Sequence, residues 1–388
     1  MDSLDSFAQQ KLTKTFERFP ASFSSSQSPL ALIDDRQMHL FSSSNYLGFA
    51  EDPRLISAAQ QASAAFGVGS GGSRLTTGTT TVHEQLEDSL KIFFGVEDAI
   101  FFATGYQANV STISALAGSE VTIYSDQRNH ASIIDGTRLA AADCHIFPHR
   151  DYDHLERLLA QRTTRYALVI TDGVFSMNGT LADLPRLREI CDNAGAWLMV
   201  DDAHGIGAVG ATGRGTGEHF ATFAEITIGT ASKALGAEGG FTLCSAPVGR
   251  YLRNSARSFI FSTAPTPATC AAVSAALNAL SPELVAKLHD NIEHMARELH
   301  RTKLLHCSDG GWSSPIFPIA VGSEDTAVRA AQALRAAGFF APAIRYPTVP
   351  RGQAIVRATV MATHSPSEIS SFVGELSRFF GGHSQTEY

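Results

Sequence analysis

Short apolar segments alternate with longer amphipathic segments between about residue 40 and residue 275. Each apolar segment carries apolar side chains at consecutive positions and ends in polar residues or glycine, which is typical of strands buried on both faces of a parallel sheet. The amphipathic segments between them predict helices that cover both faces. The predicted strands are AIFFATG (99–105), VTIYSD (121–126), YALVITDG (166–173), AWLMVDDAHG (196–205) and EITIGTASK (225–233).

The pattern changes after about residue 275, where helical segments alternate with short strands. The segment TAVRAAQALRAAG predicts a helix that stops at Gly338, and the segments FFAPAI (339–344) and AIVRATVM (354–361) predict strands. The segment SPSE (365–368) combines a capping box with proline at the first helical position, and so predicts a final helix that ends near Gly381. This mixture indicates an α+β unit.

The length of the chain supports a division into domains. With 388 residues, of which 44% are hydrophobic, the chain can bury a large core and exceeds the usual length of one domain. We predict an N-terminal helix and a Ser-rich connector at residues 1–40, a large α/β domain at residues 41–275, and a small C-terminal α+β domain at residues 276–388.

The charge and the cysteines narrow the class of protein. The formal net charge is -8 without long runs of either sign, so the sequence lacks the basic surface that binds nucleic acid or an acidic membrane. The five cysteines have neither zinc-site spacing nor the density of a disulfide scaffold, and we predict no metal site. The N-terminal segment does not resemble a secretory signal, and no apolar run reaches the length of a membrane span. We therefore expect a cytoplasmic enzyme that acts on small molecules.

Polar residues at the ends of the predicted strands are the candidate site, because ligands collect at the carboxyl ends of parallel strands. Lys233 follows the last predicted strand and is surrounded by small and apolar residues. One interpretation is a lysine that extends to the surface. The other is a partly desolvated amine with a lowered pKa that acts as a Schiff-base nucleophile.

Asp201 and His204 favour the second interpretation of Lys233. Asp201 ends a buried strand and His204 follows shortly after it, so both can face one crevice. A carboxylate can hold a proton on a pyridine nitrogen, and a histidine can hydrogen-bond the phenolic oxygen of the same ring. Alternatively, the aspartate caps a turn and the histidine lies at the surface. Together with Lys233, the pair indicates a pyridoxal 5'-phosphate (PLP) site.

Five further residues at strand ends or in the loops that follow are candidates for contact with the cofactor: Gly105, Tyr106, His130, Ser176 and Thr230. Gly105 and Tyr106 open a predicted helix whose first amides can approach a phosphate. His130 can stack on a planar ring, and the two hydroxyls can donate hydrogen bonds. Each of them also has an ordinary structural interpretation, such as strand-end packing or turn capping.

A glycine-rich segment, GVGSGGSRLTTGTT (67–80), is a further candidate for contact with a phosphate. Successive backbone amides in such a segment can form an anion nest. It lacks the pattern of a nucleotide-binding P-loop and does not plainly follow a strand. We therefore predict a loop near the site and do not assign it to the phosphate.

The order of the motifs resembles the α-oxoamine synthases, a family of fold-type I PLP-dependent transferases. The motifs are GY (105–106), NHAS (129–132), DGVFSMNG (172–179), VDDAHGIGAVG (200–210), RGTG (214–217) and TASKALG (230–236). The resemblance extends from about residue 35 to residue 365. It implies an α/β fold with a large, mainly parallel sheet domain and a smaller α+β C-terminal domain, PLP as cofactor, and a homodimer.

The resemblance also implies a role for each candidate. Lys233 links to the cofactor and transfers the Cα proton, Asp201 contacts the pyridine nitrogen, and His130 stacks on the ring; these three are the predicted catalytic residues. His204 contacts the phenolic oxygen. The complete predicted cofactor site is Gly105, Tyr106, His130, Ser176, Asp201, His204, Thr230 and Lys233.

Within the family, the segment AIRYPTVPRGQAIVRATVMATH (343–364) resembles the subgroup that condenses L-alanine with a pimeloyl thioester. It implies pimeloyl-CoA or pimeloyl-acyl-carrier protein as the second substrate. Arg357 matches the arginine that holds the amino-acid carboxylate, Thr348 a substrate-contacting threonine, and Arg18 an N-terminal substrate arginine. Tyr346 departs from the subgroup, which has proline there. Another member, such as glycine C-acetyltransferase, stays open as an alternative.

Overall fold

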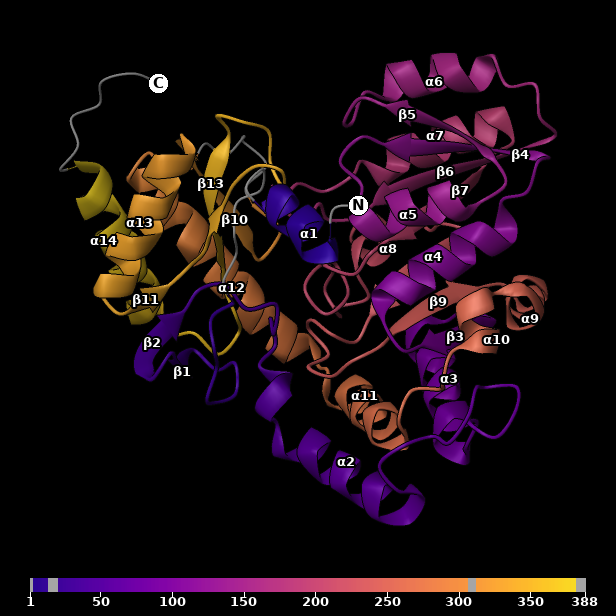
Figure 1. Cartoon of the computed structure of the whole chain (residues 1–388), viewed down its shortest axis with the longest axis horizontal. Coiled ribbons are helices and arrows are strands. Elements are labelled where there is room, and N and C mark those ends of the chain that lie inside the picture. Colours follow the sequence, from indigo (N-terminus) through magenta and orange to yellow (C-terminus); the bar gives the residue numbers. More distant parts are fainter. Residues whose placement is uncertain (1–2, 13–19, 306–311, 382–388) are drawn as a thin grey trace.

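The computed structural model describes residues 3–12, 20–305 and 312–381. Its largest element is a seven-stranded sheet with the order β3-β9-β8-β7-β6-β4-β5 (Figure 1). Neighbouring strands are parallel except at β9, which is antiparallel to both β3 and β8. The strands are β3 (Asp98–Phe102), β4 (Val121–Asp126), β5 (Asp143–Phe147), β6 (Tyr166–Asp172), β7 (Trp197–Asp201), β8 (Ile226–Thr230) and β9 (Gly240–Cys244).

Alternate side chains of the central strands enter two separate cores, as expected for a sheet covered on both faces. In β6, Leu168 and Ile170 join one hydrophobic cluster, whereas Ala167 and Val169 join the other. The helices of this part of the chain are α2 (Pro53–Phe66), α3 (Thr81–Phe94), α4 (Gly105–Leu116), α5 (Ala131–Leu139), α6 (Tyr152–Ala160), α7 (Leu184–Ala194), α8 (Thr216–His219), α9 (Ala246–Ser255), α10 (Arg257–Phe261) and α11 (Pro267–Ala279). The predicted mainly parallel sheet is therefore confirmed.

Two strands of this sheet were not predicted. Strand β5 is exposed along most of its length and lies at the edge of the sheet, so its sequence lacks a continuous apolar run. Strand β9 is fully buried and short, and it follows directly on the glycines that end the Lys233 loop. Because β9 is antiparallel to its neighbours, it needs no crossover helix before it, and the helix-strand alternation does not reveal it.

The N-terminal connector contains a hairpin that was not predicted. Strands β1 (Leu30–Ile33) and β2 (Arg36–Leu40) pair antiparallel through a two-residue loop, Asp34-Asp35, in which both residues have positive φ angles of 45° and 60°. Positive φ at both loop residues is the geometry of a type I′ hairpin, which Asp tolerates. Helix α1 (Leu4–Leu12) buries none of its residues, and the short 3₁₀ helix η1 (Phe49–Glu51) precedes α2.

The C-terminal part is a smaller α+β unit beside the large sheet (Figure 1). A three-stranded sheet has the order β10-β13-β12, and β11 pairs instead with β2 of the N-terminal hairpin. The segment FFAPAI therefore forms two short strands in different sheets, separated by Pro342, which has no N–H for a ladder. The elements are α12 (Pro282–Arg301), β10 (Ile316–Gly322), α13 (Glu324–Ala336), β11 (Phe339–Phe340), β12 (Ala343–Ile344), β13 (Ala354–Thr359) and α14 (Pro366–Gly381).

The predicted start of α14 is confirmed by its hydrogen bonds. The Glu368 carboxylate accepts from the Ser365 backbone N–H at 2.7 Å, and the Ser365 hydroxyl accepts from the Glu368 N–H at 3.3 Å. These reciprocal bonds are those of a capping box.

Among the described residues no single helix is long and apolar enough to cross a membrane, and α11 with α12 passes that test only as a pair bent by 82°.

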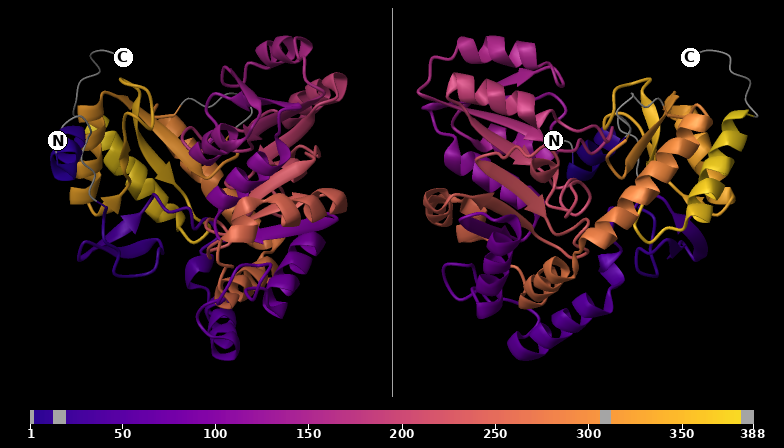
Figure 2. Two further views of the ribbon diagram at one scale, coloured as in Figure 1. Left: turned by 45° about the vertical axis from the view of Figure 1, so that its right-hand side comes forward. Right: turned by 180° about the vertical axis from the view of Figure 1, so that it is seen from behind.

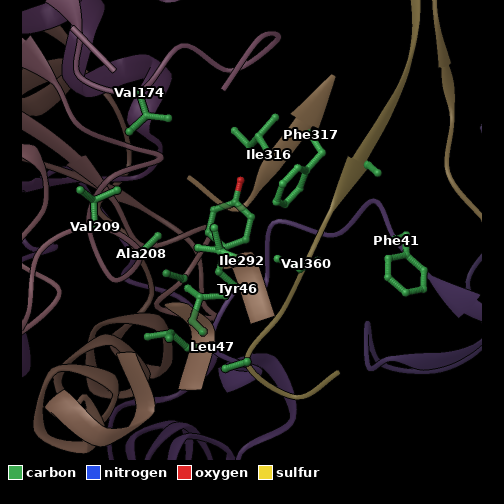
Figure 3. Close-up of a cluster of buried hydrophobic side chains, with 14 of the residues drawn as sticks. Phe41, Tyr46, Leu47, Val174, Ala208, Val209, Ile292, Ile316, Phe317 and Val360 are labelled. Carbon is green, nitrogen blue, oxygen red and sulfur yellow. The ribbon is translucent and has the colours of Figure 1, made fainter. Parts of the chain in front are cut away.

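One hydrophobic cluster joins the two units. It includes Val174 and Val209 from loops of the large sheet, Ile292 from α12, and Phe317 from the small sheet (Figure 3). Helix α12 runs between the two units (Figure 2). The shared core keeps the small unit at a constant position against the strand ends, so that residues of both can contribute to one site.

His364 connects the N-terminal hairpin to the C-terminal unit. Its ring is buried and stacks on Phe41 at 4.3 Å between centroids. Its Nε2 lies 3.0 Å from the Leu40 carbonyl oxygen, and its Nδ1 accepts the Met361 N–H at 3.0 Å. Both ring nitrogens are thus satisfied only in the neutral form, and burial lowers the pKa of His364 to about 4.

This histidine predicts an acid-sensitive contribution to stability. The unfolded ring titrates near pH 6.5 and the folded ring near pH 4, so between these values the unfolded chain binds a proton that the folded chain does not. The free energy of unfolding therefore falls, by on the order of 3 kcal/mol, as the pH falls through this window. We expect His364→Gln to lower the free energy of unfolding at pH 7 and to flatten its decline toward pH 4.5, measured by denaturant titration. An unchanged pH dependence would contradict this assignment.

Candidate active site

A cavity of about 240 Å³ lies at the carboxyl ends of the central parallel strands. All of the predicted cofactor residues line it, although they come from separate loops along the chain. Its wall is formed by Thr104, Gly105, Tyr106, Asn109, His130, Ser132, Asp172, Val174, Ser176, Asp201, Ala203, His204, Thr230, Ser232 and Lys233. The structure thus brings together the residues that the strand-end pattern singled out.

Asp201 is the last residue of β7 and is 6% exposed. Its Oδ2 accepts a hydrogen bond from Asn109 Nδ2 at 2.6 Å, and its Oδ1 accepts from the Ala203 N–H at 3.0 Å. On the neighbouring strand, Asp172 is its partner in register. Burial and the nearby Asp201 raise the pKa of Asp172 well above its usual value. The cavity therefore contains two carboxyl groups; Asp172 ends a predicted strand but was not among the predicted site residues.

His130 precedes α5 and presents its ring to the cavity. Its backbone N–H donates to Asp172 Oδ1 at 3.2 Å, and its Nδ1 lies 2.7 Å from the Ser132 hydroxyl. Desolvation lowers the pKa of His130; Asp201 opposes this effect, and Lys233 adds to it. Because its pKa is lowered, the His130 ring is neutral near pH 7. A neutral ring is suited to stack on a planar cofactor.

His204 is held by a tyrosine from the N-terminal part of the chain. The Tyr46 hydroxyl lies 2.8 Å from His204 Nδ1, and Tyr46 is fully buried. Burial lowers the pKa of His204 well below its usual value, and the positive charges of Lys233 and Arg357 lower it further. With Nδ1 bound to Tyr46, Nε2 is the ring nitrogen left for a ligand in the cavity.

Lys233 stands in a tight loop between β8 and β9. The loop is closed by backbone bonds from the Ala231 N–H to the Gly239 oxygen at 2.9 Å and from the Gly236 N–H to the Lys233 oxygen at 2.9 Å. Gly236 has φ +65°, and a Cβ there would meet the Ala50 backbone at 2.5 Å, so the turn requires glycine. Burial lowers the pKa of Lys233, whereas Asp201 and Asp172 raise it and Arg357 lowers it.

The N-terminal end of helix α4 also lines the cavity and is suited to an anion. Thr104 caps this helix, accepting the Gln107 N–H at 3.1 Å. A Cβ on Gly105 would lie 3.2 Å from Thr230 Oγ1, so the helix end and the end of β8 approach closely. The hydroxyls of Thr230 and Ser232 lie 2.7 Å apart at this wall. The Thr230 hydroxyl donates to the Gly239 oxygen at 2.8 Å, so the N–H groups at the start of α4 and the Ser232 hydroxyl are the donors that can turn to a phosphate.

The Tyr106 ring lines the cavity beside this helix end, and its hydroxyl donates to Asp135 Oδ2 on α5. The bond holds the ring at the mouth of the cavity. Ser176 lines the wall that faces the small unit. Neither contact was predictable from local sequence, because each depends on how α4, α5 and the loop after β6 pack.

Of the three residues predicted to contact substrate, one reaches the cavity wall, one does not, and one lies outside the described residues. Arg357 of β13 is 8% exposed, and its Nε donates to the Ser176 carbonyl oxygen at 2.7 Å. It crosses from the small unit to the cavity wall and influences the pKa of Lys233 and His204. Thr348 is exposed and does not line the cavity. Arg18 lies outside the described residues.

The glycine-rich segment 67–80 forms a loop, as predicted, and supplies no residue to the wall of this cavity. It packs against the segment that precedes α11: the Ala264 N–H donates to the Gly72 oxygen at 2.9 Å, and the Ser70 hydroxyl donates to the Ala264 oxygen at 2.9 Å. A Cβ on Gly78 would meet the Gly72 oxygen at 2.2 Å. Its glycines thus serve close backbone packing within the chain.

The polar groups that line the cavity match those of PLP, from its phosphate to its aldehyde. The α4 N-terminus and the Ser232 hydroxyl suit the phosphate, with Thr230 beside them; Asp201 suits the ring nitrogen, His204 Nε2 suits the phenolic oxygen, and the Lys233 amine suits the aldehyde. Sequence reasoning missed Asn109, Ser132 and Tyr46. Asn109 had a detectable signal, because it lies one helical turn after Gly105 and shares its face.

Comparison with known proteins agrees with this geometry. The profile of the family described as aminotransferase class I and II matches residues 36–376. A putative 8-amino-7-oxononanoate synthase from Desulfovibrio desulfuricans is 48% identical over 356 residues, covering 90% of this chain and 92% of its own length. The 8-amino-7-oxononanoate synthase 2 of Bacillus subtilis is 42% identical, covering 94% and 95%. A biotin biosynthesis bifunctional protein from Corynebacterium kroppenstedtii is 41% identical, and this chain spans 58% of its length.

Solved structures extend the similarity to the fold. The serine palmitoyltransferase of Sphingomonas wittichii superposes with a TM-score of 0.90 at 31% identity, covering 98% of this chain and 97% of its own. The 8-amino-7-oxononanoate synthase of Francisella tularensis superposes with a TM-score of 0.76 at 27% identity, covering 89% and 98%. A further structure, described as SPT with a PLP internal aldimine, has a TM-score of 0.91 at 29% identity, covering 98% and 99%. The chain therefore belongs to the aminotransferase class I and II family and, within it, to the 8-amino-7-oxononanoate synthases.

Proposed function

We propose that this protein binds PLP at the cavity and condenses L-alanine with a pimeloyl thioester, forming 8-amino-7-oxononanoate for biotin synthesis. The observation that carries the proposal is the Lys233 amine, whose pKa is lowered by burial, in one cavity with Asp201, His130 and His204. Relatives named 8-amino-7-oxononanoate synthase support the substrate pair.

PLP, when bound, supplies an electron sink for the bond that breaks at the alanine Cα. The Lys233 Nζ takes the Cα proton and later returns one, and its lowered pKa increases the neutral fraction of the amine that can act as a base. Asp201 would hold a proton at the ring nitrogen of PLP. His130 would stack on the ring and His204 Nε2 would donate to the phenolic oxygen, both as neutral histidines, because burial lowers the pKa of each.

Arg357 binds the alanine carboxylate. Its Nε is already bound to the carbonyl oxygen of Ser176, a residue of the cavity wall, and this bond anchors the guanidinium beside the cavity. Overall, a carbon–carbon bond forms between Cα and the thioester carbonyl, the thiol leaves, and the former alanine carboxyl departs as carbon dioxide. Pimeloyl-CoA and pimeloyl-acyl-carrier protein both satisfy this chemistry.

A homodimer and a cytoplasmic location stay predictions from the sequence.

Replacement of Lys233 tests the proposed nucleophile and base. We expect Lys233→Ala to abolish the visible absorption of lysine-linked cofactor and to lower turnover by at least the ~10²–10⁴-fold that a positioned base contributes. Absorption spectra and product formation measure the two effects. Lys287→Ala, which changes an exposed lysine on α12, is the matched control and should behave as wild type. Normal turnover by Lys233→Ala would refute the proposal.

Replacement of Arg357 separates substrate binding from cofactor binding. We expect Arg357→Lys to raise the KM for alanine by about tenfold or more, because a lysine retains the charge but loses the planar fork that grips a carboxylate. The KM for the thioester and the affinity for PLP should change little. Arg329→Ala, on the exposed face of α13, is the control. An unchanged KM for alanine would show that another residue binds the carboxylate.

The amino-acid preference discriminates between members of the family. With pimeloyl-CoA or pimeloyl-acyl-carrier protein, we expect alanine to give release of thiol and carbon dioxide, measured by thiol titration and labelled carboxyl loss. If glycine with acetyl-CoA gives faster turnover than alanine with either pimeloyl thioester, the protein is a glycine C-acetyltransferase. Absence of thiol release with every acyl thioester would remove acyl transfer altogether.

A further inference from the structure

We propose that Asn109 is a positioning residue that holds Asp201 and His130 in a fixed mutual orientation. The inference rests on the proposed function, in which these two residues contact the ring of PLP at its nitrogen and its face. Asn109 lies on α4, is 2% exposed, and forms part of the cavity wall.

Two side chains form a continuous connection between Asp201 and His130. Asn109 Nδ2 donates to Asp201 Oδ2 at 2.6 Å and to the Ser132 hydroxyl at 2.9 Å. The Ser132 hydroxyl lies 2.7 Å from His130 Nδ1. The residues come from three elements, α4, α5 and β7, so the connection is made by tertiary packing and not by one local motif.

The chemistry of the acceptors fixes the direction of each hydrogen bond. The Asp201 carboxylate can only accept when ionised, so it must face the Asn109 Nδ2 group. Both N–H groups of that amide are then used, and its Oδ1 is buried without a hydrogen-bond partner among the described residues. Rotating the amide would point Oδ1 at the carboxylate. The unpaired oxygen is thus the cost of directing both donors correctly.

The direction continues from Asn109 to the histidine ring. Because the Ser132 oxygen accepts from Asn109, its own proton is free to bond His130 Nδ1. The Ser132 backbone N–H donates to the same nitrogen at 3.3 Å. Nδ1 is therefore an acceptor, and the neutral ring carries its proton on Nε2. The Ser132 backbone N–H fixes this tautomer, and the connection from Asp201 through Asn109 orients the Ser132 hydroxyl as a second donor to Nδ1.

The backbones at both ends are held independently of Asn109. The His130 N–H is bound to Asp172, and Asp201 also accepts the Ala203 N–H. Loss of the Asn109 amide therefore leaves the strand and helix in place and releases only the rotation of the Asp201 carboxylate and the His130 ring. A role in orientation is for this reason separable from a role in stability.

Titration of the apoprotein with PLP tests the proposal. We expect Asn109→Ala to raise the Kd for PLP by about ten- to a hundredfold, as loss of a hydrogen bond to a charged group implies. Ser132→Ala should raise it less, because Asp201 keeps its donor. The matched control is Thr112→Val on α4, the helix that also carries Asn109. It removes the buried bond between the Thr112 hydroxyl and the Thr242 hydroxyl of β9, and should lower the melting temperature while leaving the Kd unchanged.

The nitrogen spectrum of His130 in the apoprotein gives a second readout that a purely structural role would not change. We expect wild type and Thr112→Val to give the same His130 Nδ1 resonance, and Asn109→Ala and Ser132→Ala to shift it, because the Ser132 hydroxyl is then no longer held as a donor to Nδ1. The Nε2–H tautomer should persist in all four proteins, because the Ser132 N–H still donates to Nδ1. A wild-type Kd and a wild-type Nδ1 resonance in Asn109→Ala would overturn the inference. If Asn109→Ala does not fold, the Kd and the Nδ1 resonance of Ser132→Ala decide alone. Failure of wild type to bind PLP would instead overturn the proposed function.

Discussion

The Lys233 amine shares a desolvated cavity with Asp201 and Asp172, and the arrangement of the site depends on this balance of charges. Burial lowers the pKa of the amine, the two carboxylates act against that effect, and burial with the adjacent Asp201 raises the pKa of Asp172. The pairing of β6 with β7 sets the two carboxylates side by side, and the loop after β8 carries the amine. A sheet register therefore determines which charges face the cofactor site.

The pKa values of His130 and His204 depend on burial and on charges of the same cavity. His130 and His204 both have lowered pKa values, so each can approach an aromatic cofactor without a positive charge. Asn109 and Tyr46 contribute no charge near neutral pH, but they determine which atoms of these side chains face the cavity. Catalytic geometry thus depends on neutral, buried donors as much as on the charged residues.

The small unit completes the site from the other side. Arg357 reaches the Ser176 loop from β13, and the hydrophobic cluster around Phe317 and Ile292 keeps that strand against the large sheet. The N-terminal hairpin adds β2 to β11 and brings Tyr46 to His204. Segments from both ends of the chain are therefore needed to assemble a cavity at the centre of the fold.

Much of the site was predictable because strand ends are visible in a sequence. Asp201 and Lys233 directly follow apolar strands, and a parallel sheet aligns such ends. Asn109 and Tyr46 were missed because their partners lie 92 and 158 residues away, and only packing brings them together. Strand β9 was missed because it is antiparallel to its neighbours and therefore needs no crossover helix before it. The β1–β2 hairpin was missed because its turn is Asp-Asp and contains no glycine. The resemblance supplied the roles, which geometry alone does not assign.

Reduction of the PLP-bound protein with borohydride, followed by peptide mass spectrometry, tests the central claim most directly. The reagent makes a lysine–cofactor linkage permanent, so the labelled peptide identifies the nucleophile. The lysines of the chain are Lys11, Lys14, Lys91, Lys233, Lys287 and Lys303. The account predicts a pyridoxyl group on Lys233 alone. A label on any other lysine, or none on a protein saturated with PLP, would contradict it.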